Sequence, residues 1–481
     1  MKPSAFNVSV PVSTGDVFLM NTLTDAQVVV SSDVAAFMDS LDAGPSRIPG
    51  STPDEREALE TLAKNGFLVR YLVSERAALE SHFAEFREDA SQVRVTILTT
   101  LQCNFACDYC YQGEHADLGR PAEKMSLETA AEVAVWVSRQ VDEVRPRQLV
   151  LTFFGGEPLL NVPAMTRIAE SCWRHTRAGS VRQSVNIITN GLLLSPGIVD
   201  LLTPFGLTGV KITLDGDRET HDRMRPLRGG QGTFDRIIEN VRRVASMVPV
   251  TIGGNFDATT ADRYPALLDF LKEQEFAPRI AKVAFKPIIK PTGWDRPTNA
   301  IPLRPVNSNR RPLNGSCMTA AGPSSGGSSV PASGAACGAC HFVDDTMSFL
   351  REETRRRGFP TPDGVHMGPC EVHRRHSHTI GPDGSLFACP GFTGEYALSV
   401  GHIDGRRSAE QAASASRFER LAPWRHCGDC PFIPVCGGGC AVAAHAELGD
   451  MNAPSCHRRS FESALASLAE EAARDSAGGV Q

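Results

Sequence analysis

The sequence predicts an α/β fold: an open, partial barrel of six βα units between a small N-terminal unit and a cysteine-rich C-terminal region. Three observations support this prediction. Apolar runs typical of buried strands alternate with amphipathic helical stretches from residue 93 to residue 285. None of the 14 cysteines precedes Cys103, and most follow Cys317. The length of 481 residues exceeds one compact core and indicates about three units.

The barrel is expected over residues 91–300. Its predicted strands are 93–99, 149–154, 185–189, 209–214, 248–253 and 281–285, and its predicted helices are 126–140, 162–174, 195–202, 234–246 and 261–275. Strands that alternate with helices imply a parallel sheet. Six βα units are too few to close an eight-stranded barrel but fit a partial, TIM-like (β/α)6 barrel, with its chemistry at the carboxyl ends of the strands.

The flanking segments differ in composition. We expect a winged-helix-like domain in 1–90, a bridging region in 301–365, a metal-stabilised cysteine-rich domain in 366–460, and a C-terminal helix and tail in 461–481. Within the first domain, the predicted strands are 17–20, 27–30 and 66–72, and the predicted helices are 33–41 and 54–65. In the bridging region, ten of 19 residues from Gly322 to Cys340 are Gly or Ser, which predicts a flexible loop. The cysteine-rich domain shows little hydrophobic periodicity, so we expect metal to replace a hydrophobic core there.

Charge and hydropathy exclude several classes of function. The 49 basic residues nearly balance the 55 acidic ones, so no basic face indicates binding to nucleic acid or to anionic lipid. Neither a signal-like start nor an apolar stretch long enough to span a membrane occurs, which predicts a cytoplasmic protein without membrane contact. Because cytosolic thiols stay reduced, the cysteines indicate metal or redox chemistry rather than a disulfide framework.

Three cysteines, Cys103, Cys107 and Cys110, directly follow the first barrel strand. Three thiolates on one loop can hold three irons of a cubane cluster and leave the fourth iron open to an exogenous ligand. A structural zinc site is the alternative, but such a site needs four closed ligands, and only His115 lies nearby in sequence.

A second motif, Gly155-Gly156-Glu157-Pro158, follows the second strand. Two glycines let the backbone approach a ligand closely, and a carboxylate beside them can pair with an ammonium group. A tight turn without a binding role is the alternative.

With these two motifs in this order, the chain resembles the radical S-adenosylmethionine (SAM) enzymes. The resemblance implies that Cys103, Cys107 and Cys110 are the catalytic ligands of a 4Fe-4S cluster. It implies a SAM site formed by Tyr111, Gly155, Gly156, Glu157, Pro158, Asn190 and Thr213. In that site Tyr111 would line the adenine and Thr213 would face the ribose. Asn and Thr at strand ends are also common turn and capping residues.

The C-terminal cysteines resemble a SPASM domain, the extension that carries two auxiliary 4Fe-4S clusters in peptide-modifying members of this superfamily. The resemblance implies one cluster on Cys427, Cys430, Cys436 and Cys456, and a second on Cys370, Cys389 and Cys440. The second cluster lacks a fourth ligand. The candidates are an upstream cysteine (Cys317, Cys337 or Cys340), a histidine (His373, His376 or His378) and a substrate thiolate. We favour an upstream cysteine, because a Gly/Ser tether reaches the site with little strain. Cys337 and Cys340 could instead form a redox pair or half of a zinc site.

The resemblance implies an enzyme that matures ribosomally made peptides and is related to the anaerobic sulfatase maturases. Reductive cleavage of SAM would give a 5′-deoxyadenosyl radical that abstracts hydrogen from a peptide, which then closes a thioether or carbon–carbon crosslink. Sulfatase-type oxidation and epimerisation are alternatives, and a non-catalytic iron–sulfur electron carrier is an alternative from another class. Pro390 follows Cys389 where sulfatase maturases place an Asp, which argues against formylglycine formation.

Two partners follow from the resemblance. Residues 20–23 and 65–69 resemble segments of leader-peptide-recognition domains, which implies that a precursor peptide adds as a strand to the N-terminal domain. A purely structural cap is the alternative. A low-potential donor such as flavodoxin or ferredoxin would supply the electron.

Overall fold

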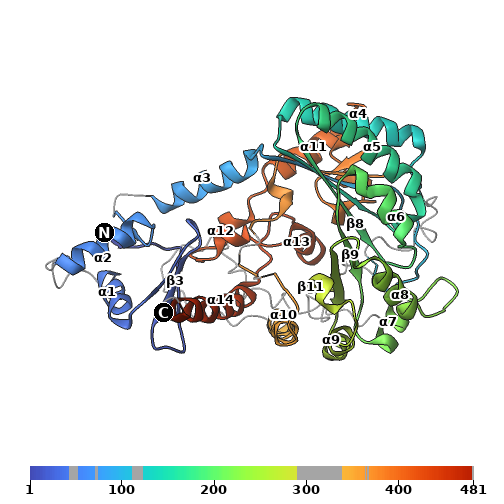
Figure 1. Ribbon diagram of the computed structural model, residues 1–481. Coiled ribbons are helices and arrows are strands. Elements are labelled where there is room, and N and C mark those ends of the chain that lie inside the picture. Colours follow the sequence, from blue (N-terminus) through green and yellow to red (C-terminus); the bar gives the residue numbers. More distant parts are fainter. Residues whose placement is uncertain are drawn as a thin grey trace, which may run out of the picture.

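The computed structural model describes residues 1–42, 53–70, 74–110, 123–289, 338–362, 364–365 and 368–478. Figure 1 shows an N-terminal arm on one side, a barrel on the other, and C-terminal elements between them. The two ends of the chain both lie on the arm (Figure 1).

The barrel contains six parallel strands in the order β11-β10-β9-β8-β7-β6. They are β6 (Gln92–Leu98), β7 (Gln148–Phe154), β8 (Arg182–Thr189), β9 (Leu207–Thr213), β10 (Val250–Phe256) and β11 (Ile280–Pro287). All six strands predicted from the apolar runs are therefore confirmed. Their inward side chains, such as Val95, Leu151 and Ile187, are buried in one continuous core.

Helices connect these strands and cover the sheet (Figure 1). They are α4 (Leu127–Val144), α5 (Val162–Ala178), α6 (Pro196–Leu202), α7 (Arg218–Met224), α8 (Phe234–Val244) and α9 (Tyr264–Lys272), with short 3-10 turns η1 (Pro158–Asn161), η2 (Thr203–Phe205), η3 (Ala261–Arg263) and η4 (Ala277–Arg279). Ser126 caps α4, since its hydroxyl accepts a hydrogen bond from the amide of Thr129 at 3.0 Å. Among the described residues, no helix has the length and apolar character needed to cross a bilayer.

The C-terminal region extends the barrel sheet. β12 (Ser377–Ile380) pairs in parallel with β6, and β13 (Ser385–Phe387) and β14 (Gly401–His402) follow antiparallel, so that the sheet has nine strands in the described residues. Its other elements are α10 (Gly338–Arg356), η6 (Glu371–His373), η7 (Pro390–Phe392), η8 (Tyr396–Leu398), α11 (Ala409–Glu419), η9 (Pro423–His426), α12 (Ile433–Cys436), α13 (Ala441–Leu448) and α14 (Arg458–Gly478).

This region also has a hydrophobic core of its own. Phe392, Leu398, Phe418 and Leu421 are buried together, and Cys389 packs against them. The sequence reasoning thus missed this hydrophobic core, and stabilisation of the region by metal stays a prediction. The apolar residues come from short turns and helices, whose periodicity is too brief to detect in the sequence.

The N-terminal arm is built on a three-stranded antiparallel sheet in the order β2-β3-β4. Its elements are β1 (Lys2–Pro3), β2 (Asn7–Pro11), β3 (Val17–Asn21), β4 (Ala26–Val30), α1 (Ser32–Asp42), α2 (Pro53–Lys64), β5 (Leu68–Val69) and α3 (Glu75–Glu88). The predicted strands 17–20 and 27–30 and the predicted helices 33–41 and 54–65 are confirmed, whereas of the predicted strand 66–72 only Leu68–Val69 is a strand, and residues 71–72 lie outside the described residues. The sequence reasoning missed β1, β2 and α3, and the winged-helix-like assignment stays a prediction. Figure 1 shows α3 running from the arm towards the barrel.

One substitution tests the packing of the barrel sheet. A Cβ at Gly254 in β10 would lie 2.3 Å from the carbonyl oxygen of Leu214 and 2.7 Å from the ring of Tyr264. We expect Gly254→Ala to lower the free energy of unfolding by about 1–3 kcal/mol, as overpacking does. In the control Gly197→Ala, the new Cβ meets nothing within 4 Å, and stability should hold or rise slightly. Urea denaturation of both variants measures the difference, and equal losses would contradict this account of the sheet.

Candidate active site

The loop that carries Cys103, Cys107 and Cys110 leaves the carboxyl end of β6 and is held by the segment that follows α7. The amide of Ala106 donates to the carbonyl of Pro226 at 2.9 Å. The guanidinium of Arg228 donates to the carbonyl of Cys103 at 2.9 Å. The three-cysteine loop therefore has a fixed path at the expected edge of the barrel.

The two glycines of the second motif pack directly on this loop. The amide of Gly156 donates to the carbonyl of Thr100 at 3.0 Å, and the amide of Glu157 donates to the carbonyl of Gln102 at 2.8 Å. A Cβ at Gly155, which has φ of 132°, would lie 2.3 Å from the Thr100 oxygen, and a Cβ at Gly156 would lie 2.2 Å from the Gln102 oxygen. Side chains at either position would push the two loops apart.

Glu157 ties the motif to the next strand. Its fully buried carboxylate accepts hydrogen bonds from the hydroxyl of Thr189 at 2.7 Å and from the amides of Asn190 at 2.8 Å and Leu159 at 3.0 Å. Pro158 begins the turn η1. The carboxylate thus joins the ends of β7 and β8, a positioning role that the sequence reasoning did not foresee. Its contact with an ammonium group stays a prediction.

The remaining residues of the expected SAM site lie at neighbouring strand ends. The side-chain amide of Asn190 donates to Asn104 Oδ1 at 2.8 Å and lies 3.9 Å from the sulfur of Cys103. Thr213 is the last residue of β9 and pairs in register with Gly253 of β10. Tyr111 lies outside the described residues. The structure therefore brings Asn190 beside the cysteine loop and places Thr213 at the end of the next strand, β9, along the same edge.

A buried polar network lies behind the cysteine loop, and sequence reasoning missed most of it. Tyr109, between the second and third cysteines, donates its hydroxyl proton to Asp215 and accepts a hydrogen bond from Arg225. The second carboxylate oxygen of Asp215 accepts from the amide of Asn255 at 2.6 Å, and its backbone amide donates to the ring of His221 at 3.2 Å. Burial raises the pKa of Tyr109 well above its ordinary value, so the phenol stays protonated. The sequence feature that could have indicated this network is the aromatic residue inside the cysteine motif.

The thiols of Cys103 and Cys107 are largely buried, so their ionisation requires a nearby cation. Burial raises the pKa of Cys103 to about 11 and that of Cys107 to about 12. A coordinating metal deprotonates a thiol outright, so these side chains fit thiolate ligands of iron. In the described part of the chain, no three Cys, His, Asp or Glu side chains are arranged to hold a single metal ion.

A cavity of about 460 Å³ lies between the barrel edge and the C-terminal region. The barrel contributes Tyr109 and Asn255, the end of β11 contributes residues 286–289, and the C-terminal region contributes Gly391, Phe392, Glu395, Cys440, Val442, His445 and Ala446. Most of these side chains are apolar. Lys286, Glu395 and His445 add ionisable groups, and the Nδ1 atom of His445 is buried without a hydrogen-bond partner among the described residues.

The C-terminal cysteines form two groups in space. Cys370, Cys389 and Cys440 lie close enough for their charges to interact. Cys427, Cys430, Cys436 and Cys456 form a second such group. Cys440 lines the cavity next to the barrel, so the first group lies beside the cavity that Tyr109 also borders. Of the candidate upstream ligands, Cys317, Cys337 and the side chain of Cys340 lie outside the described residues.

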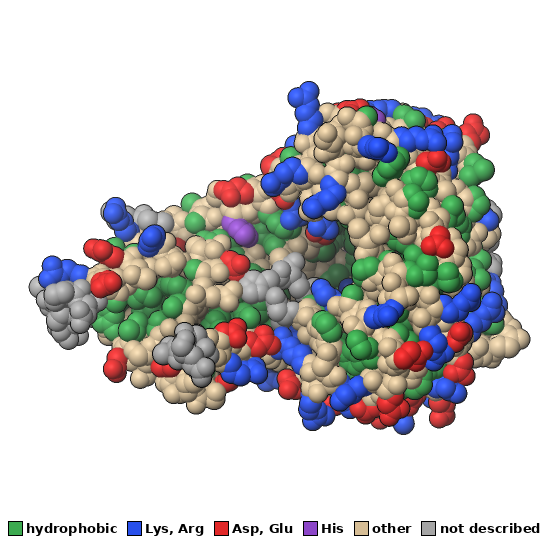
Figure 2. Space-filling model, viewed as in Figure 1, with side chains coloured by type: hydrophobic (Ala, Val, Ile, Leu, Met, Phe, Trp, Pro, Cys, Tyr) green, Lys and Arg blue, Asp and Glu red, His purple; other side chains and the backbone are tan. Residues whose placement is uncertain are grey.

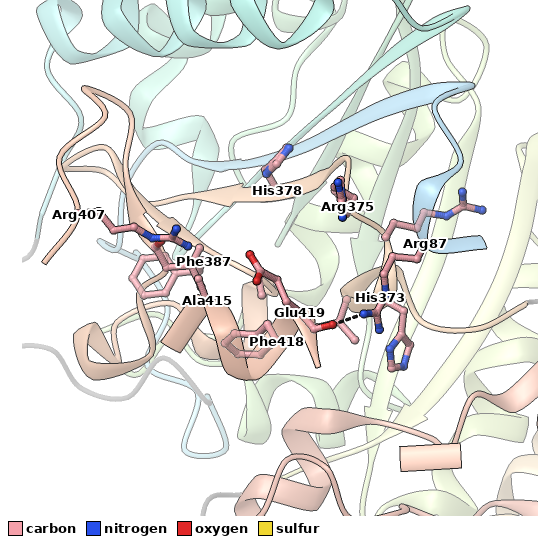
Figure 3. A pocket seen from close by; sticks show the side chains of 14 residues that line it. Arg87, His373, Arg375, His378, Phe387, Arg407, Ala415, Phe418 and Glu419 are labelled. Carbon is pink, nitrogen blue, oxygen red and sulfur yellow. Dashed lines mark hydrogen bonds between the residues drawn. The ribbon is translucent and has the colours of Figure 1, made fainter. Parts of the chain in front are cut away.

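Two of the candidate histidines line another pocket, of about 480 Å³. Figure 3 shows His378 and His373 on opposite sides of it, with Arg87, Arg375 and Arg407 around them. Burial lowers the pKa of each histidine to about 4, so both are neutral at pH 7. The ring of His378 packs edge-on against Trp136 at 5.1 Å, and that of His373 against Trp424 at 5.2 Å. Aromatic packing accounts for the position of both rings, but both ring nitrogens of His373 and the Nε2 atom of His378 are buried without a hydrogen-bond partner among the described residues. The role of these histidines as cluster ligands stays a prediction.

The Glu157 contacts generate a test. In Glu157→Gln, the amide group would face donors on both sides, so at least one buried hydrogen bond must be lost. We expect the free energy of unfolding to fall by about 1–3 kcal/mol. The control Glu132→Gln changes an exposed residue of α4 in the same chemical way and should have no effect. Denaturation curves measure the free energy of unfolding of both variants. A Glu157→Gln variant as stable as the parent protein would contradict the positioning role.

Comparison with known proteins agrees with this geometry. The sequence model described as the Radical SAM superfamily matches residues 97–269. Fe-coproporphyrin III synthase of Methanosarcina barkeri (strain Fusaro) is 27% identical over 207 residues, 42% of this chain and 46% of that protein. Sporulation killing factor maturation protein SkfB of Bacillus subtilis (strain 168) is 27% identical over 171 residues, 35% of this chain and 37% of that protein. The chain thus spans less than half the length of either relative.

Solved structures show the same fold. Native anSMEcpe with bound AdoMet superimposes with a TM-score of 0.56 at 15% identity, covering 80% of this chain and 100% of that one. Native anSMEcpe with bound AdoMet and Kp18Cys peptide also gives 0.56, at 14% identity, covering 80% and 99%. Residues 97–269, which carry the three-cysteine loop, therefore form a radical SAM domain.

Proposed function

We propose that the protein is a radical SAM maturase that forms a thioether or carbon–carbon crosslink in a ribosomally made peptide. One observation supports this most directly: a single cavity is bordered on one side by Tyr109 of the three-cysteine loop and on the other by Cys440 of the C-terminal group. A substrate in that cavity would lie between a radical-generating centre and an electron-accepting one. The resemblance to SkfB, a maturation protein by name, favours a peptide substrate.

In this proposal Cys103, Cys107 and Cys110 hold a 4Fe-4S cluster, and the segment 155–158 with Asn190, Thr213 and Tyr111 holds SAM. When bound, these groups supply a 5′-deoxyadenosyl radical. The chain itself holds the cysteine loop against Gly155 and Gly156, and keeps the second loop in place through Glu157. The neutral phenol of Tyr109 is fixed by Asp215 and Arg225 at the wall of the cavity.

The cavity would hold the reacting peptide side chain and exclude water. Ile288, Phe392 and Val442 give it apolar walls, which protect a carbon radical from side reactions. Lys286 and Glu395 place opposite charges in the same cavity, so a peptide group could be oriented there by a hydrogen bond or ion pair.

The C-terminal cysteines would hold two auxiliary clusters, in the groups 370/389/440 and 427/430/436/456. Such clusters could accept the electron released when the crosslink closes. The cavity beside Cys440 leaves room for a substrate thiolate as the missing fourth ligand, and an upstream cysteine remains the ligand that we favour. A low-potential flavodoxin or ferredoxin would supply the electrons for SAM cleavage.

The N-terminal arm would recognise a leader peptide. Within the described residues, β2 and β4 are the edges of its sheet, and Val28 of β4 is 36% exposed. Figure 2 shows hydrophobic side chains gathered on this arm. Partly buried apolar residues there include Val30, Val34 and Phe37. An edge strand beside such residues suits the addition of an extended peptide, with backbone hydrogen bonds for affinity and pockets for specificity.

The catalytic role of the first cysteine group can be tested in one variant. We expect Cys107→Ala to abolish 5′-deoxyadenosine formation under dithionite and SAM, because the open-iron cluster loses a ligand. Iron content should fall from about twelve per chain to about eight, since two cubane clusters remain. Liquid chromatography and iron analysis after anaerobic reconstitution measure both quantities.

The matched control is Cys172→Ala. Cys172 is buried in α5, outside all three cysteine groups, so its loss should change neither quantity. Persisting 5′-deoxyadenosine formation in Cys107→Ala would rule out the catalytic assignment, and about four irons in the parent protein would rule out the auxiliary clusters. Mass spectrometry of a coexpressed precursor should show loss of a hydrogen pair for each crosslink.

A further inference from the structure

The loop from Cys427 to Cys436 packs against the N-terminal arm, although more than 330 residues separate them. Cys427 and Cys430 contact a buried apolar cluster made of Phe6, Leu79 and Phe83 from the arm and α3, together with Ala422, Trp424 and Ile433 from the C-terminal region. Cys430 also contacts a second cluster, which includes Phe18 and Met20 of β3. The N-terminal segment therefore forms part of the surroundings of these cysteines.

Polar contacts fix the same interface. The hydroxyl of Thr22 donates to the carbonyl of Pro431, inside the cysteine loop itself. The ring of His82 lies at hydrogen-bond distance, 3.2 Å, from the carbonyl of Pro434. Arg425 donates to both carboxylate oxygens of Glu80, at 2.9 and 2.7 Å. These contacts join the cysteine loop, and Arg425 just before it, to α3 and to the end of β3.

At the centre of the interface lies an aromatic pair. The rings of Phe83 and Trp424 stack at 3.9 Å with an interplanar angle of 17°, and each side chain is 3% exposed. His373, which lines the pocket seen in Figure 3, packs edge-on against Trp424. Trp424 therefore contacts a residue of the pocket wall and belongs to the apolar cluster that Cys427 and Cys430 contact.

We propose that α3 and the arm form the protein wall of the cluster held by Cys427, Cys430, Cys436 and Cys456, and that this wall sets its reduction potential by excluding water. The proposal rests on the function proposed above, which places a 4Fe-4S cluster on these thiolates. Reduction adds negative charge to such a cluster, and water stabilises added charge better than an apolar wall does. A complete wall therefore keeps the potential low, and an opening in the wall raises it.

The proposal gives the N-terminal arm a second role beside peptide recognition. The strand that would receive a leader peptide and the wall of the cluster belong to one packed unit, since β3 pairs with β4 and also contacts Cys430 through its buried side chains. Deletion of the arm would therefore disturb the cluster as well as any peptide binding, and point variants are the cleaner test.

The test compares Phe83→Ala with Leu62→Ala in the full-length, reconstituted protein. Leu62 is equally buried, at 5% exposure, but lies in a separate core of the arm with Leu19, Met38 and Phe67. Redox titration followed by electron paramagnetic resonance gives the midpoint potential of each cluster, and the signal lost in Cys436→Ala identifies the cluster in question. We expect Phe83→Ala to shift that potential upward and to leave the other signals unchanged, whereas Leu62→Ala shifts none.

Three outcomes would overturn the proposal. Two of these outcomes overturn this proposal and leave the auxiliary-cluster assignment intact. They are an unshifted potential in a Phe83→Ala protein that retains its iron, and the same shift in both variants. A parent protein without the signal assigned through Cys436→Ala would overturn it together with the auxiliary-cluster assignment. If Phe83→Ala does not accumulate, Phe83→Leu replaces it, and a smaller upward shift supports the proposal while no shift overturns it.

Discussion

The close approach of two backbones at the carboxyl edge of the barrel is the constraint on which the site depends. Leu98 and Phe154 end neighbouring parallel strands in register, so the chains that leave them must share one space. Glycines at 155 and 156 remove the side chains that would separate them. Direct backbone hydrogen bonds then fix the cysteine loop relative to residues 155–158, and the carboxylate of Glu157 extends the same arrangement to β8.

The parts of the fold that could be predicted from sequence are those whose partners lie close in the chain. In the barrel strands buried apolar residues recur at close spacing, as in β6 and β7 where buried and partly exposed residues alternate, so each strand can be recognised from its own sequence. The cysteine motifs depend on spacing within one loop or one short domain. In contrast, Tyr109 contacts Asp215 across 106 residues, and nothing local in the sequence relates the two. α3 buries only Leu79 and Phe83 of its 14 residues, a pattern too weak to predict a helix. The two side chains are buried because they pack in one cluster with Trp424.

The structure also relates parts of the chain that the sequence divides into separate domains. The cavity takes its walls from the cysteine loop, from the end of β11 and from the C-terminal region. α10 and α14 pack together, and α14 contacts the N-terminal sheet, so the last helix connects the arm to the barrel side (Figure 1). Few long-range contacts of this kind produce a hydrophobic periodicity in the sequence, because each element presents only a few residues to each neighbour.

The pairing of β12 with β6 has a consequence for synthesis of the protein. In the finished sheet β6 is an interior strand, between β7 and β12. On the ribosome, however, β6 emerges about 280 residues before Ser377–Ile380, so one side of the strand that leads to the three-cysteine loop stays an open edge while most of the chain is made. Unpaired edges of this kind attract other strands, and vectorial folding cannot close this one early. Chains that stop before β12 would therefore have a barrel with an unpaired, aggregation-prone edge strand. Slow translation of the segment between β6 and β12 would prolong the time during which this edge can aggregate.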